Sequence, residues 1–415
     1  MTSMDQSSAA PIALPTTRSG LFDPPAELGR LREQEPIRRL AFPGGEVAWL
    51  VTDYAIGRLV LGDQRFGKHL DDPQMHDFPA FAAAMGRLHE QGDPSMAALR
   101  AGNFAQMDPP EHTRFRQLLA PYFPMGRLRA DLQAVIEGIV EDCMQEMEAA
   151  GPPVDLVSTF AGPVPLRSIC HMLGVPASGH EIVYAFTSSS LGHEPDADAM
   201  PTVIQATGEL MREVIAHKRA HPADDLLSRL VVGGELTDEE IVGVGMGLAA
   251  AGSHTTSAML AHGTFALLSE RERWATLVAD PDGIEKASEE LLRYLTVNQL
   301  DAHTRTARED VELGGVRIAK GERVQVSLPA VNRDSERFEE PDKLDIARDA
   351  RGHLTLGHGI HICLGQHLAR LEMHVAFAGL TRRFPELHLA VPADEVPMPP
   401  GSAPLYSPLR LPVAW

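Results

Sequence analysis

The segment around Cys363 carries the strongest chemical signature in the chain. Residues 356–365 read LGHGIHICLG, so two glycines precede the cysteine and allow the backbone to turn tightly. The pattern predicts a helix that begins near Cys363, and a helix N-terminus favours a thiolate over a thiol. Three interpretations are open at this point: a buried cysteine in a glycine-rich turn, a zinc site that uses the neighbouring histidines, and a haem iron held by the thiolate.

Three further segments combine residue types that could bind or position a ligand. Glu290 and Arg293 lie three residues apart on one face of a predicted amphipathic helix, where an exposed pair of this kind contributes only roughly 0.2–0.5 kcal/mol. His112 and Arg116 lie four residues apart, so they share a helical face and could grip a dianionic group. Residues 251–256, AGSHTT, place two kinds of hydroxyl in mid-helix, where hydroxyls are unfavourable. Hydroxyls that bond back to the carbonyl four residues earlier, with a ligand pressed against the glycine, would explain this segment.

The elements that must position these residues are mainly helical. Apolar residues recur at helical spacing over residues 128–147. Residues 237–240 read TDEE, the spacing of a capping box, and they open a helix that lacks Asp, Glu, Lys and Arg from 241 to 269. A final helix is expected from near Cys363 to about Phe384.

Strands are a minority in the predicted fold. Residues 47–51 and two short alternating runs within 311–326 predict strands, and residues 71–110 predict a long functional loop with short helical pieces. Residues 1–20 predict a mobile tail. Because no linker divides the remainder, residues 21–415 are expected to form a single, mainly α domain with minor β sheets.

Composition excludes several classes of partner. The 415 residues carry a formal net charge of −20, which argues against a nucleic-acid binder and against an anionic membrane surface. The uncharged run at 241–269 is long enough to span a bilayer, but it contains polar residues and lacks an aromatic belt, so a helix buried in protein is expected instead. Three cysteines cannot build a disulfide framework, which predicts a reducing cytoplasm.

These segments, in their order along the chain, resemble the motifs of the cytochrome P450 family of haem-thiolate monooxygenases. The resemblance covers essentially residues 20–415 and is closest to the soluble bacterial class. The family's cysteine motif, FGxGx[H/R]xCxG, matches at every fixed position except the first, where Leu356 replaces phenylalanine and preserves the apolar character.

The resemblance implies a role for each candidate residue. Cys363 would be the axial thiolate ligand of haem b, and Glu290 with Arg293 would form a structural ion pair beneath it. Gly252 would lie against the haem, and Thr255 would help to deliver protons to iron-bound oxygen. The haem would lie between the long central helix and the cysteine loop. Its propionates would be held by cationic or hydrogen-bonding residues, namely His112, Arg116, Arg305 and His361.

One position departs from the family pattern. The residue before the threonine is normally an acid, and here it is His254. An imidazole can relay protons because its unperturbed pKa is about 6.5, but it is not a fixed anion. The alternative role for His254 is packing, or a hydrogen bond to a polar group of the substrate.

The resemblance implies a monooxygenase that takes two electrons from a ferredoxin and its reductase, splits O2 and inserts one oxygen atom into an apolar small molecule. The expected substrates are intermediates of bacterial secondary metabolism. A haem enzyme of the same fold that catalyses oxidative coupling, cyclisation or rearrangement without net oxygenation is the alternative, and a non-haem zinc protein is a third hypothesis.

Overall fold

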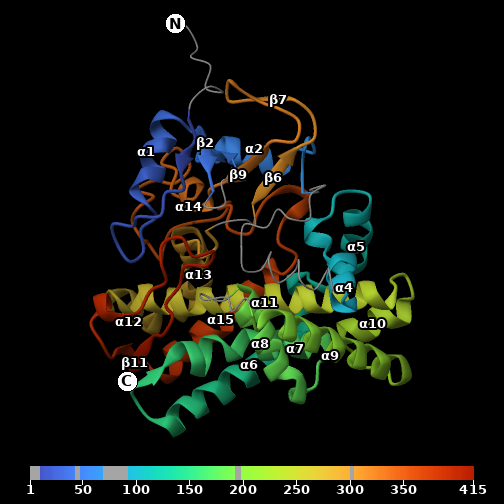
Figure 1. Cartoon of the computed structure of the whole chain (residues 1–415). Coiled ribbons are helices and arrows are strands. Elements are labelled where there is room, and N and C mark those ends of the chain that lie inside the picture. Colours follow the sequence, from blue (N-terminus) through green and yellow to red (C-terminus); the bar gives the residue numbers. More distant parts are fainter. Residues whose placement is uncertain (1–9, 43–46, 69–91, 192–197, 300–302) are drawn as a thin grey trace, which may run out of the picture. The chain divides into compact units, whose positions relative to one another are not determined.

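The chain folds into two compact units (Figure 1). The computed structural model describes residues 10–42, 47–68, 92–191, 198–299 and 303–415. Unit 1 takes in Met1–Asp71, Glu285–Cys363 and Pro399–Tyr406, and unit 2 takes in Asp72–Ile284, Leu364–Met398 and Ser407–Trp415. Residues 1–9 of the expected tail and residues 71–91 of the expected loop lie outside the described residues.

Unit 1 is built on a mixed six-stranded sheet with the strand order β1-β2-β3-β9-β6-β4. Its strands are β1 (Ile12–Ala13), β2 (Ile37–Ala41), β3 (Val47–Val51), β4 (Phe66–Gly67), β6 (Thr304–Ala307) and β9 (Arg323–Val326). The strand predicted at residues 47–51 is confirmed, and it pairs antiparallel with β2 and parallel with β9. Ile12 and Ala13 pair with Leu40 and Ala41, so this part of the expected tail belongs to the sheet.

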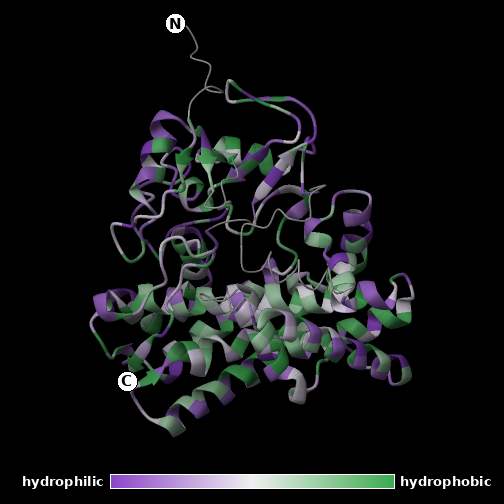
Figure 2. Ribbon diagram, in the orientation of Figure 1, coloured by the Kyte–Doolittle hydropathy of each residue, from purple (hydrophilic) through white to green (hydrophobic). Residues whose placement is uncertain are grey.

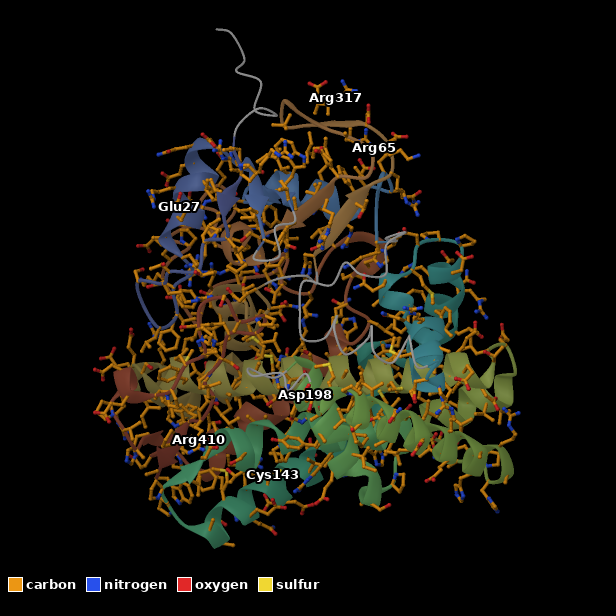
Figure 3. All side chains as sticks on the ribbon, viewed as in Figure 1. Glu27, Arg65, Cys143, Asp198, Arg317 and Arg410 are labelled. Atoms are coloured by element: carbon orange, nitrogen blue, oxygen red, sulfur yellow. The ribbon has the colours of Figure 1, made fainter. Side chains whose placement is uncertain are left out.

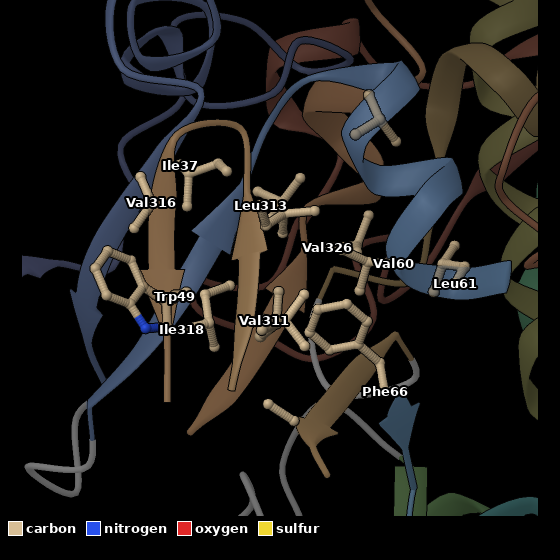
Figure 4. Close-up of a cluster of buried hydrophobic side chains, with 14 of the residues drawn as sticks. Ile37, Trp49, Val60, Leu61, Phe66, Val311, Leu313, Val316, Ile318 and Val326 are labelled. Carbon is tan, nitrogen blue, oxygen red and sulfur yellow. The ribbon is translucent and has the colours of Figure 1, made fainter. Parts of the chain in front are cut away.

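The hydrophobic core of unit 1 lies between this sheet, a two-stranded hairpin and a helix. The hairpin strands β7 (Val311–Leu313) and β8 (Val316–Ile318) confirm the short strands predicted in this region, and Gly314 and Gly315 make the turn with positive φ. Their alternate residues pack against α2 (Tyr54–Gly62), as Figure 4 shows. Each buried Val, Leu, Ile or Phe contributes roughly 1.5–3 kcal/mol to folding. The other helices of unit 1 are α1 (Ala26–Gln34), α13 (Ile284–Leu295) and α14 (Leu328–Val331).

Unit 2 is predominantly helical, and its helices mix hydrophobic and hydrophilic residues along their length (Figure 2). Its helices are α4 (Pro94–Gly102), α5 (Glu111–Leu119), α6 (Met125–Ala150), α7 (Pro163–Leu173), α8 (His180–Leu191), α9 (Met200–Ala220), α10 (Leu226–Gly233), α11 (Asp238–Leu268), α12 (Arg271–Ala279) and α15 (Gln366–Arg383). A small antiparallel sheet has the order β10-β11-β5, formed by His388–Leu389, Pro412–Ala414 and Val154–Asp155.

Helix α11 is the long uncharged helix that the sequence predicts. Its 31 residues correspond to about 46 Å at 1.5 Å per residue. Thr237 and Glu240 form the predicted capping box, in which the Thr237 amide donates to Glu240 at 2.8 Å and the Glu240 amide donates to Thr237 at 3.3 Å. Helices α4, α7, α8 and α9 pack against it, which explains why so many of its residues are buried and uncharged.

Glycines allow α4 and α11 to cross at close range. A Cβ atom at Gly102 would clash with the backbone of Val244, and a Cβ atom at Gly243 would clash with the carbonyl of Ala98. Both helices therefore need glycine at the crossing point, where backbone packs directly against backbone.

The last helix begins later than the sequence predicts. Its first residue is Gln366, three residues after Cys363, and Gly365 is its N-cap without a side-chain hydrogen bond. The preceding residues are held by the turns of the cysteine loop, which compete with helix formation there. Among the described residues, we find no helix that combines the length and apolarity needed to cross a membrane.

Candidate functional site

The loop that carries Cys363 is a tight turn in unit 1. Gly357 and Gly359 have φ values of 77° and 73°, which favour glycine over other residues. The Cys363 amide donates to the carbonyl of Leu356 at 2.8 Å and closes the loop. A Cβ atom at Gly359 would lie 2.6 Å from the Leu61 carbonyl oxygen, so the loop can pack against α2 only with glycine there. These contacts leave Cys363 half-buried at the end of a rigid turn.

The other two cysteines differ from Cys363 in burial. Cys143, on α6 (Figure 3), and Cys170, on α7, are completely buried. Burial raises the pKa of Cys143 to about 11 and that of Cys170 to about 12, so both remain neutral thiols. Cys363 is therefore the one cysteine of the three that can meet a ligand without repacking a core.

Glu290 and Arg293 form a fully buried ion pair on α13. Arg293 Nε donates to one carboxylate oxygen of Glu290 at 2.7 Å, and Arg293 Nη2 donates to the other at 2.8 Å. Both side chains are 0 % exposed. The remaining donors of Arg293 reach the carbonyls of Asn332 and Pro341 at 2.8 and 2.9 Å, so the guanidinium ties the helix to the segment after β9.

Partners that the sequence did not suggest complete this network. Arg348 Nε donates to Glu290 at 3.1 Å, and the Asp345 amide donates to the same oxygen at 3.0 Å. Asn332 donates to Thr296 at 3.0 Å and accepts from the Leu354 amide at 2.8 Å. Each of these partners is distant in sequence from the group it binds. Arg348 lies 58 positions from Glu290, and Asn332 lies 36 positions from Thr296 and 22 from Leu354. No short sequence motif can therefore contain them.

Two of the four predicted anion-binding residues lie in unit 1. Arg305 is buried in β6, with 2 % of its surface exposed, and it donates to the Thr304 carbonyl at 2.9 Å. His361 ends the short 3-10 helix Gly359–His361 of the cysteine loop and is half-buried. His112 and Arg116 belong to unit 2, where both lie on α5; His112 is buried and Arg116 is half-buried.

Thr255, His254 and Gly252 lie in the middle of α11 in unit 2. The Thr255 hydroxyl donates to the Ala251 carbonyl at 2.8 Å and the Ser253 hydroxyl donates to the Ala249 carbonyl at 2.8 Å, which confirms the predicted back-bonding. Thr255 and His254 are half-buried. A Cβ atom at Gly252 would lie 3.1 Å from Ile169 of α7, so helix packing gives one reason for glycine there.

Glu372, on α15, is a buried acid that the sequence analysis missed. It is completely buried, and burial raises its pKa well above the usual range for glutamate. The hydroxyls of Thr256 and Ser168 lie beside the carboxyl group and act in the opposite direction, but burial has the larger effect. The Ser168 hydroxyl already donates to the Val164 carbonyl at 2.7 Å, so it can only accept a hydrogen bond from a protonated Glu372.

The zinc hypothesis gains no support from the side chains that the structure describes. Among them, no group of three or more His, Cys, Asp or Glu residues lies close enough together to hold a metal ion. Cys363 and His361 share the cysteine loop and Arg305 lies in the same unit, so these residues offer one soft sulfur, an imidazole and a guanidinium, which suit a metal that brings its own ring nitrogens and carboxylates.

The chain matches known proteins along almost its whole length. It is 39 % identical over 408 residues to cytochrome P450 105C1 of a Streptomyces species, covering 98 % of this chain and 99 % of that protein. The chain belongs to the cytochrome P450 family. The P450 is also 38 % identical to nocardicin C N-oxygenase of Nocardia uniformis and to pentalenic acid synthase of Streptomyces avermitilis, over 96 % and 100 % of this chain and 99 % and 100 % of those proteins.

Solved structures and the family model agree with this assignment. The sequence model described as Cytochrome P450 matches residues 284–403, which contain the buried ion pair and the cysteine loop. GfsF superimposes with a TM-score of 0.86 at 35 % identity, covering 97 % of this chain and 99 % of that one. CYP105P1 in complex with filipin I superimposes with a TM-score of 0.86 at 34 % identity, covering 98 % of this chain and 99 % of that one. This P450 is therefore a haem monooxygenase, and its family holds the haem iron through a cysteine thiolate.

Proposed function

We propose that Cys363 is the thiolate ligand of the haem iron and that this P450 oxygenates an apolar small molecule of secondary metabolism. The observation that carries the proposal is the cysteine loop, in which two left-handed glycines and the amide-to-carbonyl bond from Cys363 to Leu356 present one half-buried sulfur. Haem bound there supplies the iron at which dioxygen is activated.

The propionate groups of the haem need cationic or hydrogen-bonding partners, and unit 1 offers two of them. Arg305 brings a buried guanidinium to β6, and His361 brings an imidazole to the loop that holds Cys363. His112 and Arg116 would supply the others from one face of α5, because a spacing of four residues aligns their side chains. Their assignment rests on the family motif and on this shared helical face.

Thr255 and His254 would hold and move protons on α11. The Thr255 hydroxyl donates its hydrogen to the Ala251 carbonyl, so the lone pairs of Oγ1 can accept a hydrogen bond from another donor. An imidazole differs from a carboxylate here, because imidazole has an unperturbed pKa of about 6.5 and a carboxylate stays anionic at neutral pH. The pair would therefore pass protons in a pH-dependent way, unlike a fixed carboxylate at the position of His254.

The substrate class is inferred from the relatives and from α11. Mycinamicin IV hydroxylase/epoxidase of Micromonospora griseorubida, 36 % identical over 93 % of this chain and 94 % of that protein, is named for the oxidation of a natural product. Ala249, Ala250 and Gly252 are the expected substrate contacts on α11, where Ala250 and Gly252 are half-buried and Ala249 is fully buried in helix packing. Residues 297–300 are the other expected contacts, and residue 300 lies outside the described residues.

A ferredoxin is the proposed electron donor, and unit 1 offers a place for it near the cysteine loop. Leu59 and Ile360 expose 47 % and 41 % of their surface, and Arg58 and His358 line an open hollow beside them. Exposed apolar residues next to a cation suit a small acidic protein. In unit 2, by contrast, Arg127, Arg114 and Arg383 are already paired with acids of their own unit.

The second candidate function is oxidative coupling, cyclisation or rearrangement on the same haem without net oxygenation. The histidine at position 254 favours it, because a family acid is missing from the position beside Thr255. A cytoplasmic location stays a prediction from the free cysteines.

Two experiments test the proposal. The reduced carbonyl complex of the purified protein should show the strongly red-shifted Soret band of a thiolate-ligated haem, and Cys363→Ser should lose that band while Cys143→Ser keeps it. Survival of the band in Cys363→Ser would show that another residue is the ligand. Incorporation of one atom of labelled dioxygen into product then separates oxygenation from the second candidate function.

A further inference from the structure

Arg18 ties the N-terminal segment of unit 1 to a loop that follows α13. Arg18 Nη1 donates to the Asp23 carbonyl at 2.8 Å, and Arg18 Nη2 donates to the side-chain oxygen of Gln299. The guanidinium also lies over the ring of Tyr406, with its carbon atom 3.6 Å from the ring centroid. One half-buried side chain therefore connects Gln299 to a segment that lies 281 positions earlier in the sequence.

The 297–299 loop pairs with residues 404–406 as two short antiparallel segments. The amides of Gln299 and Tyr406 each donate to a carbonyl of the opposite segment, at 2.9 and 2.8 Å. Arg18 contacts both sides of this pairing, because it bonds to Gln299 and lies over Tyr406. The position of the loop therefore depends on Arg18 as well as on its own backbone hydrogen bonds.

The loop leaves α13 through a residue in a strained conformation. Thr296 directly follows the helix and has a φ of 39°, a left-handed conformation that is unfavourable for a β-branched side chain. Its hydroxyl donates to the Arg293 carbonyl at 2.9 Å, and its own carbonyl accepts from the side-chain amide of Gln299. Such a conformation persists only when the surrounding contacts hold it. Arg18 supports one of these contacts, because it holds the other end of the Gln299 amide group.

Arg18 can hold two partners at once because its guanidinium is a planar fork. Burial lowers the pKa of Arg18 to about 10, and the charges of Tyr406 and Asp23 oppose this effect, so the group is a cation at neutral pH. The aromatic ring and the two hydrogen bonds stabilise this partly buried charge. A lysine would bring one compact ammonium group instead, which cannot reproduce the geometry of the fork.

The same loop belongs to the segment proposed above to contact the substrate. The path of its backbone sets where the side chains of residues 297–299 meet a bound molecule. A displacement of about 1 Å in such a positioning element can change a reaction rate by roughly 100-fold. A residue that holds the loop can therefore affect substrate binding without touching the substrate.

We propose that Arg18 is a positioning residue for substrate binding, which holds the 297–299 loop in place through the side chain of Gln299. This inference rests on the proposed function, because that proposal makes the loop a substrate contact. It adds a residue of the N-terminal segment, to which neither the sequence motifs nor the names of the relatives assign a role.

The test compares two compounds that bind the iron of the haem-loaded protein through an imidazole nitrogen. Imidazole itself is small, whereas 4-phenylimidazole adds a phenyl ring that has to fit among the substrate contacts. Soret titration of the oxidised protein gives both dissociation constants, and their ratio is the preference for the phenyl ring. Amide hydrogen exchange of the peptide that contains residues 297–299 reports the loop itself, independently of any ligand.

Four variants separate the role of Arg18 from a general loss of stability. Arg18→Met removes the fork and keeps an unbranched side chain, and Arg18→Lys keeps the charge without the fork. Arg30→Met is the matched control, because Arg30 lies on α1 of the same unit with its side chain 67 % exposed. Gln299→Met, alone and combined with Arg18→Met, tests whether the two residues act as one unit.

The preference for 4-phenylimidazole should fall by about fivefold in Arg18→Met, because a loop that is no longer held has to be ordered when the ligand binds. Exchange of the loop amides should become faster by about tenfold in the same variant. Arg30→Met should match wild type within about twofold in both measurements. The double variant should show the same preference as Gln299→Met alone, since the effect of Arg18 passes through Gln299.

An unchanged preference in Arg18→Met overturns the inference, whatever the exchange of the loop shows. Additive effects in the double variant overturn it as well, because Arg18 would then act by a route other than Gln299. If Arg18→Met does not retain haem, Arg18→Lys takes its place in the same comparison, with an expected fall of about threefold.

Failure of the proposed function would look different. In that case the wild-type protein itself would lack haem with the red-shifted carbonyl band, whereas the difference in loop exchange between Arg18→Met and Arg30→Met would still be measurable.

Discussion

The buried ion pair on α13 and the middle of α11 are held in position by different interactions. Glu290 and Arg293 are held by their mutual charge and by hydrogen bonds with residues 332–348. Thr255 bonds only back into its own helix in the contacts described above, and α11 is located by glycines and small residues that let other helices approach. The ion pair in unit 1 is held by charge and hydrogen bonds, whereas α11 is held by close packing against other helices. The two regions should therefore fail in different ways when they are altered.

The largest effect is expected from Glu290→Ala. The variant leaves the cations of Arg293 and Arg348 buried or half-buried without their carboxylate, which should lower the free energy of unfolding by about 3–5 kcal/mol and reduce haem content. Urea unfolding and the haem-to-protein absorbance ratio measure both effects. Glu285→Ala, at an exposed position of the same helix, should stay within about 0.5 kcal/mol of wild type. Equal stability of the two variants would contradict an electrostatic anchor.

The packing of α11 is tested by a pair of glycine substitutions. Gly243→Ala puts a methyl group into the backbone of α4 and should lower the free energy of unfolding by about 1–3 kcal/mol. At Gly247, on the same helix, a Cβ atom meets nothing within 4 Å, so Gly247→Ala should stabilise by about 0.5–1 kcal/mol through its higher helix propensity. Thermal unfolding of both variants measures these changes. Equal destabilisation by Gly247→Ala would contradict the idea that close helix packing at Gly243 holds α11 in position.

Glu372 offers a charge test inside the helical unit. Its folded-state pKa is raised above an unfolded value of about 4.3, so its contribution to stability is fully present below that pH and is lost as pH rises through the folded pKa. Relative to Glu372→Gln, wild type should lose up to about 1.4 kcal/mol for each pH unit in that window. Urea unfolding from pH 4 to 8 measures the slope, with exposed Glu395→Gln as control. If the free energy of unfolding changes with pH by the same amount in wild type and Glu372→Gln, burial does not raise the pKa of Glu372.

The smallest effect on stability is expected at His254, where the change should be functional. If its imidazole relays protons to Thr255, the fraction of reducing equivalents that reaches product should depend on pH, because an imidazole, unlike a carboxylate, can change its charge near neutral pH. His254→Ala should then release peroxide while substrate affinity is unchanged, and His254→Glu should restore coupling with a flatter pH profile. Spectral dissociation constants measured beside the coupling fraction separate the two roles, because weaker binding with intact coupling in His254→Ala assigns the residue to the substrate instead.

The sequence predicts best what is encoded locally. The strand at residues 47–51, the capping box at Thr237 and the back-bonded hydroxyls of α11 each depend on residues a few positions apart, and the structure has all of them. The sequence predicts too early a start for α15, because the turns that hold Cys363 depend on backbone contacts to Leu356 and α2 rather than on helix propensity.

Long-range partners could not be predicted from local patterns. Arg348 joins Glu290 across 58 positions, and Arg293 reaches the Pro341 carbonyl across 48 positions. Glu372 was overlooked for another reason: a glutamate between apolar residues on a helix is usually solvated, and only the packing of the folded unit shows that its carboxyl group is enclosed.

The small sheet of unit 2 has a consequence for how the protein is made. Its middle strand, β11, pairs with β5, and the Leu411 amide donates to the Asp155 carboxylate across 256 positions. At about 5–20 residues per second, the ribosome needs roughly 13–50 s to reach β11 after it has finished β5. Throughout that time β5 lacks its partner strand, so this sheet can form only at the very end of synthesis.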